Sequence, residues 1–286
     1  EDGIRDPLWS RGLGDVYKRQ EQYINHPYPD PIENMDEQIN NYNYAQMSGM
    51  DLLWRKLYPE KEYDEKLDVL IAGCGTNQAV YHAIKFPESK NYAIDVSQSS
   101  IDHVHKMIKK FSIKNLEIEK KDIIELDNKN EFDYVISTGV IHHTKDPLKS
   151  LQSLVNVTKA DGALFIMVYA IYLRQGIYYL QDAFEYLGLE PTKKDVGLIR
   201  NLIKLLPSDH YALNYINKIQ QTFGTKDLSF DAGVVDTFLN ARDVAYDING
   251  LKNLIESSGA FFQCWEDNNF YSVSYTHLTL PTKRIV

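Results

Sequence analysis

The fold is decided by one stretch, Leu67-Asp68-Val69-Leu70-Ile71-Ala72-Gly73-Cys74-Gly75-Thr76-Asn77-Gln78. Its apolar beginning predicts a strand that is buried on both faces. The two glycines that follow, and the helical pattern after them, predict a tight turn between a strand and a helix. Asp95 closes the next apolar run, 20 residues after Gly75. A strand, a glycine turn, a helix and a second strand ending in an acid are typical of a nucleotide-binding sheet.

Strands and amphipathic helices alternate after this stretch. Strands are predicted at 68–72, 92–95, 116–119, 134–137 and 163–169. Helices are predicted at 50–57 and 77–85, and from the N-caps Ser97 and Asp146 onward. This rhythm predicts an α/β fold, a Rossmann-like parallel sheet with helices on both faces.

The rhythm stops between residues 170 and 246, where the pattern is helical at 171–187, 196–206, 211–222 and 233–239. This predicts a helical insert between strands five and six, which we expect to act as a lid, a substrate wall or an association surface. The rhythm returns with a helix at 247–258, closed by Gly259 as the residue after its C-cap, and with strand six at 261–265.

Composition limits the classes of partner. The net charge of −9 argues against binding to a phosphate backbone. No apolar run is long enough for a transmembrane helix, and no signal peptide is visible, so no membrane partner is expected. Cys74 and Cys264 fit no disulfide or metal pattern, which favours a reducing, cytoplasmic setting.

The glycine turn carries the first functional hypothesis. Glycine lets the backbone approach a ligand closely, and the helix start behind the turn favours an anion. A dinucleotide fingerprint has a third glycine at the place of Gln78, so an NAD(P) site is a weaker interpretation. The carboxylate of Asp95 could accept hydrogen bonds from ribose hydroxyls. The alternative, an acidic cap on the next helix, is weakened because Ser97 already suits that role.

Three further features share this layout: Gly73-Cys74-Gly75-Thr76, Asp122 after strand three, and Gly139-Val140-Ile141-His142-His143 after strand four. Together they resemble the motifs of class I S-adenosylmethionine (SAM)-dependent methyltransferases. The resemblance implies that Asp95 binds the ribose, that Asp122 faces the adenine, and that Gly139 lets the methionine portion pass. Asp122 could instead be a turn residue. The implied cofactor-binding residues are Ala72, Gly73, Cys74, Gly75, Asn77, Gln78, Asp95, Val96, Asp122, Ile123, Ser137, Thr138 and Gly139.

The turn departs from the family pattern at two places. Many members have an acid where this chain has Ile71, and a third glycine where it has Asn77. Asparagine tolerates a positive φ better than other non-glycine residues, so we expect the turn to survive. The contacts to the methionine end of the cofactor are expected to differ.

Weaker hypotheses concern the acceptor side. His142, His143 and Tyr169 are candidates for a general base, although a structural role is favoured for the histidines. Adjacent histidines rarely point at one ion, so no metal site is expected. The candidates for substrate contact are Tyr28, Tyr169, Tyr172 and Arg242. Arg242 and Asp243 could equally belong to a surface salt bridge.

The middle of the chain also resembles a bacterial subset of these methyltransferases that is sometimes fused to tetratricopeptide repeats, at 25–29, 69–78, 137–147 and 236–247. Both termini resemble sequencing-adapter read-through, as in a metagenomic fragment. The family usually has an antiparallel strand seven between strands five and six. We expect it to be missing here, or poorly replaced by residues 270–275.

The expected organisation has six segments. They are a non-native-looking tail at 1–20, an extended and helical segment at 21–66, the SAM-binding core at 67–169, the helical insert at 170–246, the last helix and strand of the core at 247–272, and a second tail at 273–286. The expected activity is SAM-dependent methylation of a small-molecule or protein acceptor, without nucleic acid, and with a repeat domain fused to or associated with the natural protein. The alternatives are an NAD(P)-dependent oxidoreductase and a non-catalytic SAM-binding module.

Overall fold

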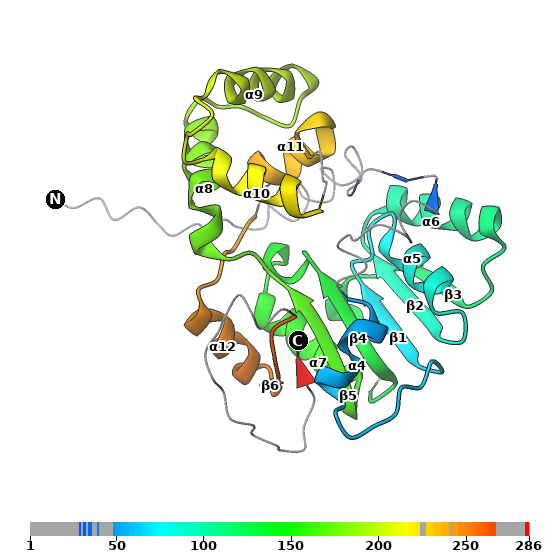
Figure 1. Ribbon diagram of the computed structural model, residues 1–286. Coiled ribbons are helices and arrows are strands. Elements are labelled where there is room, and N and C mark those ends of the chain that lie inside the picture. The colour runs from blue at the N-terminus through cyan, green and yellow to red at the C-terminus, as the bar shows by residue number, and fades with distance from the viewer. Residues whose placement is uncertain are drawn as a thin grey trace. The chain divides into compact units, whose positions relative to one another are not determined.

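The structure is a computed structural model, and it describes residues 29, 31–32, 34–35, 39, 48–127, 129–223, 227–240, 242–266 and 284–285. The chain divides into two compact units (Figure 1). The sheet unit contains residues 32–168 and 248–286, and the insert unit contains residues 1–31 and 169–247.

The sheet has seven strands in the order β3-β2-β1-β4-β5-β7-β6. Their bounds are β1 Asp68–Ala72, β2 Lys90–Asp95, β3 Leu116–Lys120, β4 Phe132–Thr138, β5 Thr158–Met167, β6 Phe261–Phe262 and β7 Arg284–Ile285. Every pairing between them is parallel. The predicted Rossmann-like α/β fold is therefore confirmed.

Among the described residues, the sheet unit contains the α-helices α4 Met50–Leu57, α5 Gln78–Lys85, α6 Gln98–Phe111, α7 Pro147–Val157 and α12 Ile248–Ser257. The strand order runs outward from β1 to β3 on one side and from β4 to β6 on the other. Because crossovers between parallel strands are right-handed, this reversal places α5 and α6 on one face and α7 and α12 on the opposite face (Figure 1).

The predicted helix signals have local physical causes. The Ser97 hydroxyl accepts a hydrogen bond from the Ser100 amide, so α6 begins where its N-cap predicts. The Asp146 carboxylate does the same for the Lys149 amide at the start of α7. Gly259 follows α12 with a φ of 85°, as expected of a residue after the C-cap.

The core of the sheet unit is built on β1. Leu70, Ile71 and Ala72 are fully buried, which matches the prediction of a strand covered on both faces. The apolar stripe of α4, with Leu53 and Leu57, packs in the same cluster as Ile71. The helix before β1 is therefore part of the sheet unit's core.

The last strands differ from the prediction. β5 spans Thr158–Met167 instead of 163–169, because its partner β4 ends at Thr138, which pairs with Met167. β6 ends at Phe262 because its partner β7 supplies only two residues. β7 lies between β5 and β6 but runs parallel to both, whereas the strand seven of the family is antiparallel, so the family's strand is not formed by Arg284–Ile285. Residues 270–275 lie outside the described residues.

The insert unit is helical. It contains α8 Ile171–Tyr186, α9 Lys193–Leu205, α10 Leu213–Phe223, the short 3-10 helix η4 Asp227–Ser229, and α11 Asp231–Phe238. Ile177, Val196 and Phe238 belong to its separate apolar core. A β-bridge between Ala170 and Tyr246 joins its two ends. No helix in the described part of the chain is long and apolar enough to cross a membrane.

Candidate functional site

The predicted cofactor residues gather at one edge of the sheet unit. Ala72 pairs with Ile94 on β2, and Asp95 pairs with Lys120 on β3. Because all these strands are parallel, their carboxyl ends lie at the same edge. The strand order reverses between β1 and β4, which is where ligands bind in open sheets of this class.

The glycine turn has the geometry that its sequence predicts. Gly73 has a φ of 72° and Gly75 a φ of 55°, both in the left-handed region that favours glycine. The amides of Gly73 and Cys74 donate to the Ile94 carbonyl at 2.8 and 3.1 Å. A Cβ at Gly73 would lie 2.4 Å from Cγ2 of Val140. The turn is thus held between β2 and the loop after β4.

Asn77 does not need its tolerance of a positive φ. It has a φ of −123°, and it is the N-cap residue of α5, although its side chain does not cap that helix. Instead, the Asn77 Oδ1 accepts a hydrogen bond from the Ile32 amide at 3.2 Å. The third glycine of the family pattern is therefore not needed at this position, because Asn77 has a negative φ, which any residue can adopt.

Gln78 crosses from the start of α5 to the tip of β4. Its Nε2 donates to the Thr138 hydroxyl at 3.0 Å and to the Ser48 hydroxyl at 3.2 Å. The Ser48 hydroxyl also lies 3.0 Å from Nε2 of the buried His82. A chain of hydrogen bonds thus joins Ser48, two residues before α4, to the edge of the sheet.

Asp95 ties the turn to the next helix. Its Oδ2 accepts from the Gly75 amide and its Oδ1 from the Ser97 amide, both at 2.8 Å. Burial raises the pKa of Asp95, while the amides of Ser97, Gly75 and Val96 oppose that shift. The predicted ribose acceptor therefore also organises the backbone, and with three amides bound about one of the roughly four lone-pair positions of the carboxylate remains for a ligand.

Asp122 is the N-cap of the 3-10 helix η2, which spans Ile123–Glu125. Its Oδ1 accepts from the Ile124 amide at 3.2 Å, and the Glu125 carboxylate accepts from the Asp122 amide at 2.9 Å. The interpretation as a turn residue thus describes one of its roles. This cap holds Asp122 in place after β3, and Ile123 beside it is buried.

The end of β4 supplies three more of the predicted residues. Ser137 is fully buried, and its hydroxyl has no hydrogen-bond partner among the described residues. Thr138 holds Gln78, as given above. Gly139 has a φ of 74°, and its amide donates to the Met167 carbonyl at 3.0 Å. Glycine at this position permits a turn that other residues would strain.

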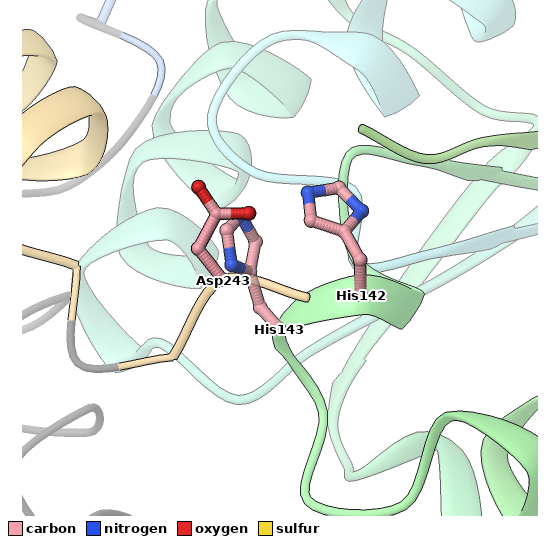
Figure 2. Close-up of side chains that lie close together, drawn as sticks. All are labelled: His142, His143 and Asp243. Atoms are coloured by element: carbon pink, nitrogen blue, oxygen red, sulfur yellow. The ribbon is translucent and has the colours of Figure 1, made fainter. Parts of the chain in front are cut away.

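His142 and His143 lie on the 3-10 helix η3, Ile141–His143, and both are buried. Their ring centroids are 4.0 Å apart, and Figure 2 shows both rings above η3. Asp243, the third side chain drawn there, belongs to the insert unit. Burial agrees with the structural role favoured for the histidines, and a role as general base stays a prediction.

The remaining acceptor-side candidates belong to the insert unit. Tyr169 lies two residues beyond β5, not at its tip, and its hydroxyl donates to Oδ2 of Asp236 at 3.2 Å. Tyr172 is 66% exposed on α8. The Arg242 amide donates to the Asn240 side chain. Tyr28 lies outside the described residues.

Arg174 was missed by the sequence reasoning. Its guanidinium donates to Asp243 at 3.0 Å, with side chains only 2% and 3% exposed. It also lies 3.7 Å from the ring centroid of Tyr169. The hypothesis of a surface salt bridge for Asp243 was therefore wrong, because this pair is buried. An arginine within an amphipathic helical pattern gives no signal that it turns inward.

Comparisons with known proteins agree with this geometry. Residues 63–187 match a family model described as "Methyltransferase domain". An uncharacterized protein of Synechococcus is 25% identical over 70% of this chain and 49% of its own length. The malonyl-[acyl-carrier protein] O-methyltransferase of Acetivibrio thermocellus is 29% identical over 35% of this chain and 34% of its own length. The chain thus spans at most about half the length of these relatives.

Solved structures share the fold. PKMT2 from Rickettsia typhi has a TM-score of 0.59 at 19% identity, over 76% of this chain and 43% of that chain. The same protein in complex with AdoHcy has a TM-score of 0.57 at 18% identity. At these identities the likeness between the structures shows the fold alone, whereas the family match compares the amino-acid sequence of residues 63–187. Residues 63–187 are therefore similar to a methyltransferase domain, and the chain shares the fold of these solved structures.

Proposed function

We propose that this chain is a SAM-dependent methyltransferase that acts on a small-molecule or protein acceptor. One observation carries the proposal, namely the convergence at one sheet edge of the glycine turn, Asp95, Asp122 and the Ser137–Gly139 segment. These residues end or directly follow four neighbouring strands, in the order β3-β2-β1-β4. A nucleoside with a charged amino-acid end has the length and polarity to lie along such an edge.

The residues present fit this cofactor. The remaining acceptor position of Asp95 suits a ribose hydroxyl. The Ser137 hydroxyl is buried without a partner among the described residues, and such a group is costly unless a ligand or water satisfies it. The close backbone at Gly73 leaves no room for a side chain next to Val140.

Methyl transfer from SAM does not require a nucleophile from the protein. Bound SAM supplies an activated methyl group and its own leaving group. The chain's residues then have to orient the two reactants in line and exclude water, which accounts for large rate effects without a nucleophile. The positioning is supported by a turn held from both sides, through the Ile94 carbonyl and Asp95. A general base is needed only for an acceptor that is protonated at the working pH.

We further propose that the insert unit selects the acceptor, because it forms a compact unit with an apolar core of its own. Tyr172 and Arg242 are the residues proposed for contact, on the strength of the exposed ring of Tyr172. The net charge of −9 supports an acceptor other than nucleic acid. The free thiols of Cys74 and Cys264 support a reducing setting such as the cytoplasm.

Cofactor binding is the first test. S-adenosylhomocysteine should raise the melting temperature of the purified chain, and NADH should leave it unchanged. Asp95→Ala should weaken the calorimetric affinity for S-adenosylhomocysteine by at least ~10-fold, through loss of charged hydrogen bonds. Asp102→Ala removes an exposed carboxylate from α6 and serves as the matched control. A shift with NADH alone would reject the proposal.

The acceptor is tested separately with tritiated SAM. Small-molecule pools, protein extracts and tRNA are offered in parallel, and label should appear in one of the first two fractions. The tRNA arm matters because a tRNA U34 carboxymethyltransferase is 27% identical over 41% of this chain. Label in tRNA would overturn the proposed acceptor class. Binding without label in any arm would favour a non-catalytic SAM-binding module.

A further inference from the structure

We infer that the exposed face of α8 is a docking surface for an arginine- or lysine-rich segment of a partner protein. The inference goes beyond the proposed function, because it holds whichever acceptor is methylated and uses no residue of the cofactor site. It concerns the insert unit alone. The surface, which we call the tyrosine stripe, consists of Tyr172, Tyr179 and Tyr186 on α8 and of Tyr211 beside them.

The three tyrosines of α8 are spaced seven residues apart, which is close to two helical turns, so they lie in one line along the helix. Successive tyrosines are ~10 Å apart along the helix axis. Their exposed fractions are 66% for Tyr172, 68% for Tyr179 and 91% for Tyr186. Ile177 and Phe184 of the same helix belong instead to the apolar core of the insert unit. Single exposed aromatic residues need no explanation, but a contiguous line of tyrosines is typical of a binding surface.

Tyr211 extends the stripe and is fixed to it. It is 49% exposed, and its hydroxyl donates to Oε1 of Gln175 at 3.0 Å. Gln175 lies three residues after Tyr172, on the same side of α8. The backbone of Ala212 packs directly on Gly176, where a Cβ would lie 2.5 Å from the Ala212 Cα. The stripe therefore has a rigid base, and a tyrosine ring loses little conformational entropy when it binds a partner.

The charges beside the stripe are acidic. Asp182 is exposed, and it lies between two rings of the stripe, three residues after Tyr179 and four before Tyr186. Asp209 is exposed two residues before Tyr211. Within the described part of the chain, neither carboxylate forms an ion pair. A cation brought by a partner can therefore meet both a ring and a carboxylate at this surface.

This chemistry favours a cationic protein segment over other occupants. An arginine or lysine can lie over the face of a tyrosine ring while it faces a carboxylate. A second copy of the chain fits less well, because pairing α8 with α8 would bring the acids of both copies together. The single basic residue of α8, Arg174, has a side chain only 2% exposed and cannot offset them. Nucleic acid is disfavoured because its phosphates would be repelled by the same carboxylates.

The test uses a fluorescently labelled peptide with arginine at every third position and serine elsewhere. In an extended chain its cations are ~10 Å apart, which matches the spacing of the tyrosines on α8. Binding to the full chain is measured by fluorescence anisotropy at low and at high salt. The arginine peptide should bind and a glutamate counterpart should not. The affinity should fall with salt, because part of the attraction is between exposed charges.

Variants locate the binding on the surface. Tyr179→Ser combined with Tyr186→Ser should weaken the arginine peptide ~5- to 30-fold, as expected for two exposed cation–π contacts. Leu205→Ser is the matched control, since it removes an 80% exposed apolar side chain from the end of α9, and it should leave the affinity within about twofold. Asp182→Asn should weaken the peptide ~2- to 5-fold, whereas Asp102→Asn, the same charge change on α6, should leave it within about twofold.

The outcomes decide this inference separately from the proposed function. S-adenosylhomocysteine should bind the double tyrosine variant as tightly as the wild type, because the stripe contains no cofactor-binding residue. The inference is overturned if the arginine peptide does not bind, or if the double tyrosine variant and Leu205→Ser weaken it equally. Equal binding of the glutamate peptide or of labelled oligouridine overturns it as well.

Sedimentation equilibrium tests the remaining occupant. The wild type should show no dimer that depends on the stripe, and a dimer that the double tyrosine variant abolishes would assign the surface to a second copy and overturn the inference. A chain that discriminates the peptides as expected but does not bind S-adenosylhomocysteine would reject the proposed function and leave the docking surface in place.

Discussion

Replacing Gly73 by alanine tests the packing of the glycine turn. The new Cβ would lie 2.4 and 2.8 Å from the two Cγ atoms of Val140. The residue would also keep a φ of 72°, which costs an L-residue ~1–2 kcal/mol. Overpacking of this kind costs a further ~1–3 kcal/mol. We therefore expect Gly73→Ala to lower the free energy of unfolding by about 2–5 kcal/mol.

A matched control separates the two costs. Gly259 lies in the same unit with a φ of 85°, and a Cβ there would meet no atom within 4 Å. Gly259→Ala should therefore show only the conformational cost of ~1–2 kcal/mol. Combining Gly73→Ala with Val140→Ala removes both Cγ atoms. The pair should then show a favourable coupling energy of about 1–3 kcal/mol.

The assay is urea unfolding followed by tryptophan fluorescence, since Trp54 is buried in the core of the sheet unit. Affinity for S-adenosylhomocysteine is measured on the folded variants. The reasoning is refuted if Gly73→Ala costs no more than Gly259→Ala. It is equally refuted if the effects of Gly73→Ala and Val140→Ala simply add, since the predicted clash would then be absent.

Three further predictions follow from buried and capping groups. Asp95→Asn removes a carboxyl group whose pKa burial raises above 3.8. The wild type therefore loses stability as the pH rises through this pKa, whereas the variant does not. The difference between the urea midpoints of the wild type and the variant should be smaller at pH 7 than at pH 4. Arg174→Met strands the buried Asp243 and should cost ~3–5 kcal/mol in urea unfolding, partly recovered by adding Asp243→Asn; an unchanged midpoint would disprove the buried pair. Asp146→Ala should cost ~1 kcal/mol by loss of the α7 cap, while calorimetry finds the affinity for S-adenosylhomocysteine unchanged.

Much of the fold could be predicted because its signals are local. The bounds of β1 and α4 agree with the prediction to the residue. Ser97 caps α6 because a serine hydroxyl can reach an amide three residues away without any tertiary contact. A positive φ at Gly73 and Gly75 follows from the need to turn a buried strand directly into a helix.

The strand ends could not be predicted in this way. β5 starts at Thr158 and stops at Met167 because hydrogen-bonded pairing lasts only as long as β4 lies beside it. The place between β5 and β6 is filled by Arg284–Ile285, from a segment whose sequence has no strand pattern. Such choices depend on which edge is open once the sheet has formed, and no single segment contains that information.

The sequence by itself determined the α/β alternation, the glycine turn and the set of acids and glycines at the strand ends, because period, capping and backbone freedom act between near neighbours. Only the tertiary structure decided what those groups touch. Gln78 reaches Thr138 across 60 residues, and Arg174 reaches Asp243 across 69. Burial removes water from the Arg174–Asp243 pair, so each of these charged groups must find its partner within the fold, and packing selects that partner.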